Sequence, residues 1–283
     1  MANDAGSDAA IWRGMTRAQL DAAYDNGTAV ANSAQIRDGW TERSARVRER
    51  FPAMLDLAYG PKPRNRIDIF PCGRAGAPLF VFIHGGYWQR NSKEIFACMA
   101  EGPLARGFDV AMIGYTLAPD ATLTEIVTET HEAIRWLRRE GPAHGVGRAK
   151  LVVSGWSAGG HLTAMALGLD EVDAGLAISG IYDVEPCRLN YLNEKLKMTA
   201  VEALAMSPIR HLPSKWTPTT VAFGIGELPE IRRQGREYHQ ARCDAGLPNR
   251  LLALETHNHF SILEELATPD GKLTAALSSL VEK

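Results

Sequence analysis

Apolar residues follow two different spacings along the chain, and the first of them is helical. Between residues 16 and 51 the apolar side chains recur at steps of about three to seven, as at Ile36, Trp40 and Val47, which predicts helices. Ser33 precedes the second helical pattern and is its candidate N-cap. The chain therefore begins with a helical segment.

From residue 55 onward the pattern is that of strands alternating with helices. Residues 55–59 and 66–70 alternate apolar and polar side chains around a Gly60-Pro61 turn, as half-buried strands do. Later strands are short, continuous apolar runs, as expected of a parallel sheet buried on both faces; they lie at 79–83, 110–113, 151–153, 176–178, 220–223 and 250–254. Helical patterns occupy 95–106, 123–139, 158–169, 229–245, 260–266 and 273–281. This alternation predicts a mostly parallel α/β sheet with helices on both faces and an antiparallel pair at one edge.

Composition and charge limit the kinds of molecule that the protein is expected to bind. The chain has 283 residues, 45% hydrophobic and 23% charged, with a formal net charge of -2, so no general attraction to nucleic acid or anionic membrane is expected. No apolar run approaches a membrane span of about 20 residues, no secretory signal is evident, and the four cysteines form no zinc or redox motif. We expect one cytoplasmic domain over residues 1–283, with a helical cap-like segment at 12–53 and a core at 54–283.

The segment around Ser157 joins a predicted strand to a predicted helix through the pattern G-x-S-x-G, from Gly155 to Gly159. A serine at such a sharp turn is held in a strained backbone, and the flanking glycines remove Cβ atoms that would collide where strand and helix cross. Its hydroxyl then projects at the carboxyl end of the sheet, where open α/β folds form their binding crevice. We therefore expect Ser157 to be a nucleophile and the backbone N–H of Ala158 to stabilise an oxyanion.

A serine hydroxyl needs a base to take its proton, and the loop after the last strand offers His257 and His259. His259, which directly precedes a helical pattern, is the preferred base, and His257 is the alternative. A metal site at this His-x-His pair is not expected, because no carboxylate or cysteine lies at ligand spacing.

A carboxylate should orient the histidine, and the turn after strand 220–223 offers Glu227 first. The glycines before it free the turn, and a proline two residues later suits the first turn of a helix. Glu230 and Asp183 are the alternatives.

The sequence from His84 to Trp88 reads HGGYW directly after a buried strand. Its glycines let the backbone curl, so we expect Gly86 and Tyr87 to donate N–H groups to an oxyanion together with Ala158. His84 is expected to hold the loop rather than act as a base. The aromatic side chains expected to line the substrate pocket are Trp88, Trp156 and Tyr182.

With these residues placed, the chain resembles the α/β-hydrolase superfamily, in the branch that contains hormone-sensitive-lipase-like esterases and kynurenine formamidases (arylformamidases). The resemblance runs from about residue 55 to the C-terminus, and the motifs that carry it are HGGYW at 84–88, YTLAP at 115–119, GELPE at 226–230 and NHF at 258–260. It implies an α/β-hydrolase fold, with the N-terminal helices lying over the pocket. Formamidases usually carry histidine where Trp156 stands and often alanine where Gly160 stands.

These features predict a serine carboxylesterase that cleaves small acyl esters through Ser157, His259 and Glu227. Arylformamidase activity, the hydrolysis of N-formylkynurenine, is the alternative, and a non-catalytic binding protein on the same fold is a remote one. The chemistry needs no cofactor or metal. The expected partner is a small-molecule ester or formamide, with no nucleic acid and no membrane, and a homodimer is left open.

Overall fold

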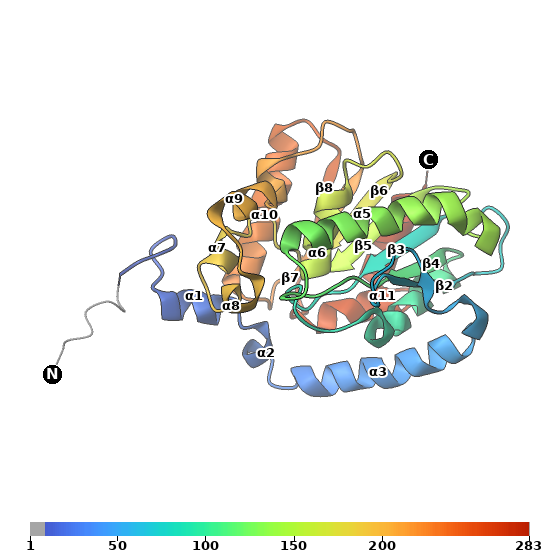
Figure 1. Cartoon of the computed structure of the whole chain (residues 1–283), viewed down its shortest axis with the longest axis horizontal. Coiled ribbons are helices and arrows are strands. Elements are labelled where there is room, and N and C mark those ends of the chain that lie inside the picture. The colour runs from blue at the N-terminus through green and yellow to red at the C-terminus, as the bar shows by residue number, and fades with distance from the viewer. Residues whose placement is uncertain (1–8, 283) are drawn as a thin grey trace.

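The computed structural model describes residues 9–282, so the ends of the predicted domain, residues 1–8 and 283, lie outside the described part. Eight strands form one sheet in the order β1-β2-β4-β3-β5-β6-β7-β8 (Figure 1). The pairs β1–β2 and β2–β4 are antiparallel, and all other pairs are parallel. The strands are β1 (Leu57–Ala58), β2 (Arg66–Phe70), β3 (Leu79–Ile83), β4 (Asp109–Ile113), β5 (Leu151–Trp156), β6 (Ala174–Ile178), β7 (Thr219–Gly224) and β8 (Asn249–Leu254). The predicted fold class, a mostly parallel sheet with an antiparallel edge, is confirmed.

The central strands are buried on both faces, which explains their continuous apolar sequences. Along β3, Leu79, Val81 and Ile83 join one hydrophobic cluster, whereas Phe80 and Phe82 join a second cluster on the opposite face. Successive side chains of a strand point to opposite faces, so both faces of the sheet need apolar cover.

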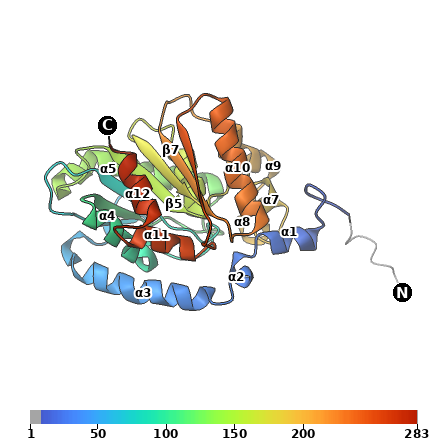
Figure 2. The ribbon, with the colours of Figure 1, turned by 180° about the vertical axis from the view of Figure 1, so that it is seen from behind.

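Helices provide that cover on both sides of the sheet. The clusters place α5, α6 and α10 on one face and η2, α4, α11 and α12 on the other. Helices α5 and α6 lie in front of the sheet in Figure 1, and α11 and α12 lie in front of it in Figure 2. Their bounds are α5 (Leu123–Glu140), α6 (Ala158–Ala166), α10 (Pro229–Asp244), η2 (Lys93–Ala100), α4 (Glu101–Ala105), α11 (Glu264–Ala267) and α12 (Lys272–Ser279).

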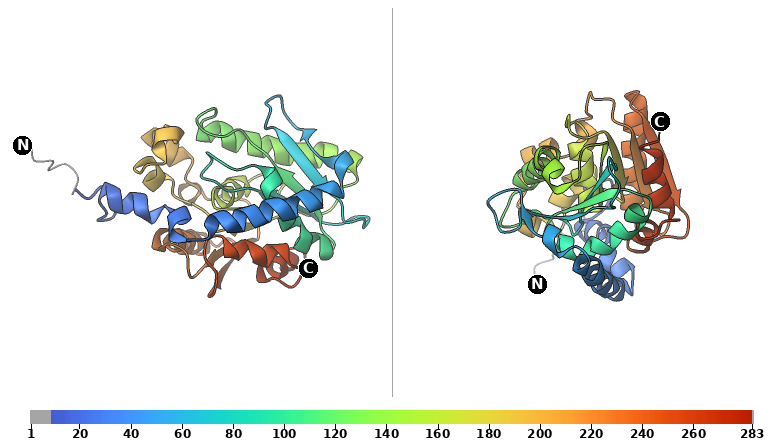
Figure 3. Two further views of the ribbon diagram at one scale, coloured as in Figure 1. Left: turned by 90° about the horizontal axis from the view of Figure 1, so that it is seen from below. Right: turned by 90° about the vertical axis from the view of Figure 1, so that its right-hand side faces the viewer.

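The N-terminal helices lie outside these layers. They are α1 (Arg17–Ala23), α2 (Asn26–Ala29) and α3 (Ser33–Glu49). Helix α3 crosses the outside of the core (Figure 3) and packs along η2, where Ser44 Oγ donates to the Ile95 carbonyl at 2.8 Å. Glu264 of α11 accepts hydrogen bonds from Trp40 Nε1 at 2.7 Å and from both terminal nitrogens of Arg43. Side chains therefore tie this segment to the C-terminal helices.

Three local predictions were wrong. The strand expected at 55–59 shortens to β1, and Ser33 is the first residue of α3 rather than its cap, with its hydroxyl donating to the Gly27 carbonyl at 3.0 Å. The helix expected at 95–106 divides into the 3₁₀ helix η2 and α4. Pro103 explains the division, because it has no N–H to continue an α-helix but fits the first turn of a new one.

Several short helices were not anticipated, because segments of three to six residues are too short for a helical period to be recognised. They are η1 (Pro52–Met54), η3 (Gly141–His144), α7 (Glu185–Arg188), α8 (Asn193–Leu196), α9 (Ala200–Ala205) and η4 (Pro208–Arg210). The helix expected at 260–266 is present as η5 (Ser261–Leu263) followed by α11. Within residues 9–282, no helix combines the length and apolarity needed to span a bilayer.

Candidate active site

Ser157 lies at the junction of β5 and α6 in a strained backbone conformation, with φ of 58° and ψ of -117°. Its N–H donates to the Ile178 carbonyl of β6 at 2.9 Å, which fixes the turn to the neighbouring strand. A Cβ at Gly159 would overlap the Ile83 carbonyl oxygen, so only glycine allows α6 to pass this close to β3. The sequence thus places the serine at the carboxyl end of the central strands.

His259 follows β8, and its Nδ1 lies 2.8 Å from Glu227 Oε2. The other carboxylate oxygen, Oε1, accepts the N–H of Gly224 at 2.6 Å and the hydroxyl of Ser179 at 2.7 Å. With the carboxylate as acceptor, Nδ1 of the imidazole carries the hydrogen and Nε2 keeps its lone pair. Both side chains are almost fully buried, so the imidazole is held in one orientation.

The alternative candidates have other partners. His257 Nε2 lies 2.9 Å from Glu265, Glu230 pairs at 2.7 Å with an arginine of its own helix, and Asp183 pairs at 3.1 Å with Arg210. Among residues 9–282, no group of three or more histidine, cysteine, aspartate and glutamate side chains is placed to hold a metal ion. The structure therefore brings Glu227, and none of the other candidates, to the preferred histidine.

The loop after β3 has an unusual backbone. Gly86, Tyr87 and Trp88 have φ values of +124°, 51° and 59°, a region that favours glycine. In the described part of the chain, the backbone N–H groups of Gly86, Tyr87 and Ala158 have no hydrogen-bond acceptor, although buried N–H groups are normally paired. Gly86, Tyr87 and Ser157 line the same cavity, and Ala158 directly follows Ser157 in the chain.

His84 holds this loop in place. Its ring stacks on Tyr115 with centroids 4.3 Å apart, and its Nδ1 lies 2.9 Å from the Gly85 carbonyl. Tyr115 in turn donates its hydroxyl to the His84 carbonyl at 2.9 Å. Burial lowers the pKa of His84 to about 4, so the ring is neutral near pH 7.

Trp156 lines the cavity and supports the histidine. Its indole N–H donates to the His259 carbonyl at 2.7 Å, and the two rings lie 4.8 Å apart. A tryptophan directly before the serine thus connects the serine turn to the histidine loop.

The other two aromatic residues expected in the pocket do not line it. Trp88 is fully buried and donates to His161 Nδ1 at 3.2 Å, and Tyr182 is fully buried and stacks on Tyr238 at 4.2 Å. The backbone of Trp88 has a positive φ. This conformation directs the side chain into the core and not into the cavity where the sequence predicted it.

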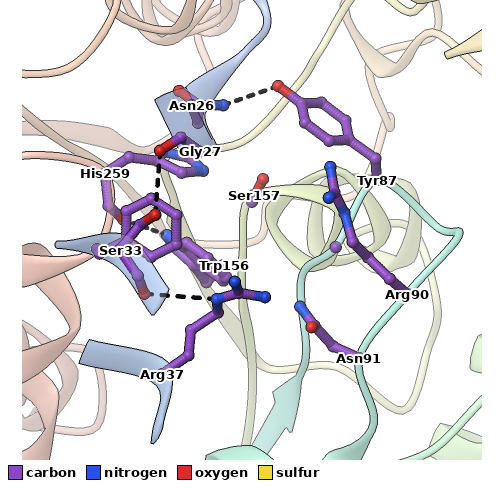
Figure 4. A pocket seen from close by; sticks show the side chains of 12 residues that line it. Asn26, Gly27, Ser33, Arg37, Tyr87, Arg90, Asn91, Trp156, Ser157 and His259 are labelled. Carbon is purple, nitrogen blue, oxygen red and sulfur yellow. Dashed lines mark hydrogen bonds between the residues drawn. The ribbon is translucent and has the colours of Figure 1, made fainter. Parts of the chain in front are cut away.

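The cavity is open to solvent, and the space between its walls, including the open mouth, is about 460 Å³. Figure 4 shows Ser157, Trp156 and His259 from the core facing side chains of the N-terminal segment and of the loop after β3. Its lining residues are Asn26, Gly27, Ser33, Arg37, Gly86, Tyr87, Arg90, Asn91, Trp156, Ser157, His259 and Phe260. Sequence reasoning missed the polar residues from Asn26 to Arg37, since no motif indicates where α2 and α3 meet the core. Arg90 and Asn91 come one residue after HGGYW, beyond Gln89, and their closeness to that motif was the available signal.

Comparisons with known proteins identify the family of this chain. A family model described as BD-FAE matches residues 67–177. The kynurenine formamidase of Danio rerio is 30% identical, and the match covers 96% of this chain and 99% of the fish protein. An isoprenylcysteine alpha-carbonyl methylesterase relative from Oryza sativa is 26% identical over 63% of this chain and 48% of its own length. The crystal structure of a thioesterase candidate from a Silicibacter species has a TM-score of 0.82 and 30% identity, and covers 92% of this chain and 99% of that one. The chain belongs to the α/β-hydrolase superfamily, in the branch that contains esterases and kynurenine formamidases.

Proposed function

We propose that this protein is a serine carboxylesterase that cleaves small acyl esters through an acyl-enzyme intermediate. One observation carries the proposal: the strained Ser157 shares a cavity with His259, whose Nδ1 is fixed at 2.8 Å from Glu227. A nucleophile, a base and a group that orients the base are the parts that acyl transfer needs. The single-domain organisation, with residues 12–53 as a cap-like segment, belongs to the same proposal.

In this mechanism Ser157 Oγ attacks the acyl carbonyl while His259 Nε2 accepts the hydroxyl proton. Glu227 keeps the hydrogen on Nδ1 and stabilises the imidazolium that forms. The N–H groups of Gly86, Tyr87 and Ala158 stabilise the negative oxygen of the tetrahedral intermediate. The imidazolium then protonates the leaving alkoxide, the alcohol departs, and water repeats the cycle to release the acid and free serine.

The proposal is tested by Ser157→Ala with p-nitrophenyl acetate as substrate. We expect kcat to fall by several powers of ten, as removal of a triad member does, and a fluorophosphonate to label wild-type Ser157 but not the variant. Ser154→Ala is the matched control, because Ser154 lies on β5, the strand that leads to Ser157, but donates its hydroxyl to the Leu176 carbonyl at 2.7 Å. Wild-type turnover by Ser157→Ala, or absence of labelling in folded wild-type protein, would refute the proposal.

Hydrolysis of an aryl formamide is the second candidate. Two observations favour it: the match to the Danio rerio kynurenine formamidase extends over 96% of this chain, and Tyr87, Trp156 and Phe260 give the cavity an aromatic wall. The same groups would cleave a formyl amide if His259 protonated the aniline nitrogen as it leaves. Comparing kcat/KM for N-formylkynurenine and for short p-nitrophenyl esters separates the two, and a strong preference for the formamide would reverse their order.

A further inference from the structure

Two arginine side chains reach the active-site cavity without a carboxylate partner. Arg37 comes from α3 and Arg90 from the loop after β3, and both line the cavity together with Ser157. Neither forms an ion pair within 4.0 Å in the described part of the chain. Figure 4 shows Arg37 and Arg90 extending toward the cavity from two different segments, with Asn91 beside them.

The cavity wall itself carries no acidic side chain: none of its twelve lining residues is aspartate or glutamate. Arg37 Nε makes one long contact, 3.4 Å, to the Ser33 carbonyl, and the Arg90 guanidinium lies 5.9 Å from the centre of the Tyr87 ring. These contacts leave most of the ten N–H donors of two guanidinium groups without a protein acceptor. An arginine fork that remains available in this way matches a carboxylate in shape and charge.

Two acidic residues share a hollow with Arg90 outside the cavity. Arg90 also borders a separate hollow with Asp21 and Asp25, but both carboxylates have other partners. Asp21 pairs with Arg17 at 2.9 Å, and Asp25 caps α2 by accepting the hydroxyl and N–H of Thr28. The hydrogen bonds from Thr28 are the main cause of the lowered pKa of Asp25, and the positive charge of Arg90 contributes less. Neither carboxylate forms an ion pair with Arg90, so the guanidinium N–H donors stay available, while the nearby charge of Asp25 weakens the positive potential of Arg90 without occupying those donors.

We propose that Arg37 and Arg90 form a subsite that binds a carboxylate on the substrate, and that the preferred substrates are therefore anionic esters or anionic aryl formamides. This inference rests on the proposed function and adds the substrate class. The carboxylate lies on the part of the substrate that Ser157 does not attack, in either the leaving group or the acyl group. Its contacts are the same before and during the reaction, so they lower KM more than they raise kcat.

The first measurement compares matched substrates on wild-type protein. Phenyl acetate and 3-carboxyphenyl acetate differ by a carboxylate on the leaving group, and p-nitrophenyl hexanoate and p-nitrophenyl hydrogen adipate differ by one on the acyl group. We expect kcat/KM to favour the anionic member in at least one pair by about tenfold or more, since a hydrogen bond to a charged group is worth about 10- to 100-fold. The pair that shows the preference identifies the side that carries the carboxylate.

The second measurement uses variants. Arg37→Gln and Arg90→Gln should each lower the anionic-to-neutral ratio of kcat/KM by roughly 10- to 100-fold, mainly through KM. The lysine variants should retain part of the ratio, because charge remains while the fork is lost. Arg46→Gln is the matched control, since Arg46 is an exposed arginine on the same helix that does not line the cavity.

The outcomes separate this inference from the proposed function. If wild-type protein hydrolyses neutral esters through Ser157 but shows no anionic preference in either pair, the subsite is refuted and the esterase stands. If no ester or formamide is cleaved, calorimetric titration with benzoate decides the subsite independently. Binding that weakens tenfold or more in both glutamine variants but not in Arg46→Gln supports the subsite, and absent or unchanged binding refutes it.

Discussion

The hydroxyl of Tyr87 joins the N-terminal segment to the loop after β3, which makes Tyr87→Phe an informative change. The hydroxyl donates to the Tyr24 carbonyl at 2.6 Å and accepts from Asn26 Nδ2 at 2.7 Å, and only 4% of the Tyr87 surface is exposed. Phenylalanine keeps the ring and its packing. The change therefore isolates two buried hydrogen bonds.

The expected loss follows from the groups left behind. A hydrogen bond contributes about 1 kcal/mol net, and a buried polar group left without a partner costs about 1–3 kcal/mol. Tyr87→Phe removes one hydrogen bond from the Tyr24 carbonyl, which keeps the Asn26 N–H at 3.1 Å and the Tyr191 hydroxyl at 3.4 Å, and it leaves the buried side-chain N–H₂ group of Asn26 unpaired. We expect the free energy of unfolding to fall by about 2–4 kcal/mol.

Urea unfolding at pH 7 measures this change, provided that the slope with denaturant is the same for wild type and variant. Tyr191→Phe is the matched control, because its hydroxyl reaches the same Tyr24 oxygen from 3.4 Å and the residue is only half-buried. We expect that variant to lose less than about 1 kcal/mol. A loss below about 0.5 kcal/mol for Tyr87→Phe, or equal losses for the two variants, would show that the reasoning is wrong.

Two further predictions concern stability. Gly159→Ala should destabilise the fold by about 3 kcal/mol, because its Cβ would overlap the Ile83 carbonyl. Gly39→Ala should stabilise the fold by about 0.5–1 kcal/mol, because Gly39 lies inside α3 and an added Cβ meets nothing within 4 Å. Thermal unfolding of both variants checks that the two changes have opposite signs. The second concerns His161, whose pKa burial lowers to about 4 and whose Nδ1 accepts from Trp88. In the unfolded chain the imidazole of His161 takes up a proton near pH 6.5, whereas in the folded chain it stays neutral down to about pH 4. The contribution of His161 to the free energy of unfolding is therefore fully present above about pH 6.5 and declines toward pH 4, by at most about 1.4 kcal/mol per pH unit. Urea unfolding of His161→Gln between pH 7 and 4 should show a shallower decline than wild type, and equal slopes would contradict the assignment.

The sequence predicted those parts of the site that depend on local geometry. The strand, G-x-S-x-G turn and helix around Ser157 lie within a short stretch, so sterics alone indicate the turn. The contact between His259 and Glu227 followed from the parallel sheet, because the carboxyl ends of neighbouring strands meet at one edge. Their catalytic roles, and those of the three N–H donors, stay predictions.

Long-range packing set the limit of sequence-based prediction. Arg37 reaches the cavity because α3 is held on the core by Trp40, Arg43 and Ser44, and no local pattern encodes where a helix docks. The inward turn of Trp88 likewise depends on a backbone conformation that its sequence neighbours did not indicate.

One wall of the cavity comes from a single stretch of chain, residues 26–37, that contributes no strand to the sheet. The groups proposed to react, Ser157, Glu227 and His259, come from the segments after β5, β7 and β8. Exchange of residues 27–37 between homologous proteins would therefore alter which molecules fit without replacing Ser157, Glu227 or His259, and keeping Asn26 would preserve its hydrogen bond to Tyr87. The same separation makes residues 27–37 the natural region for a mutant library aimed at new substrates.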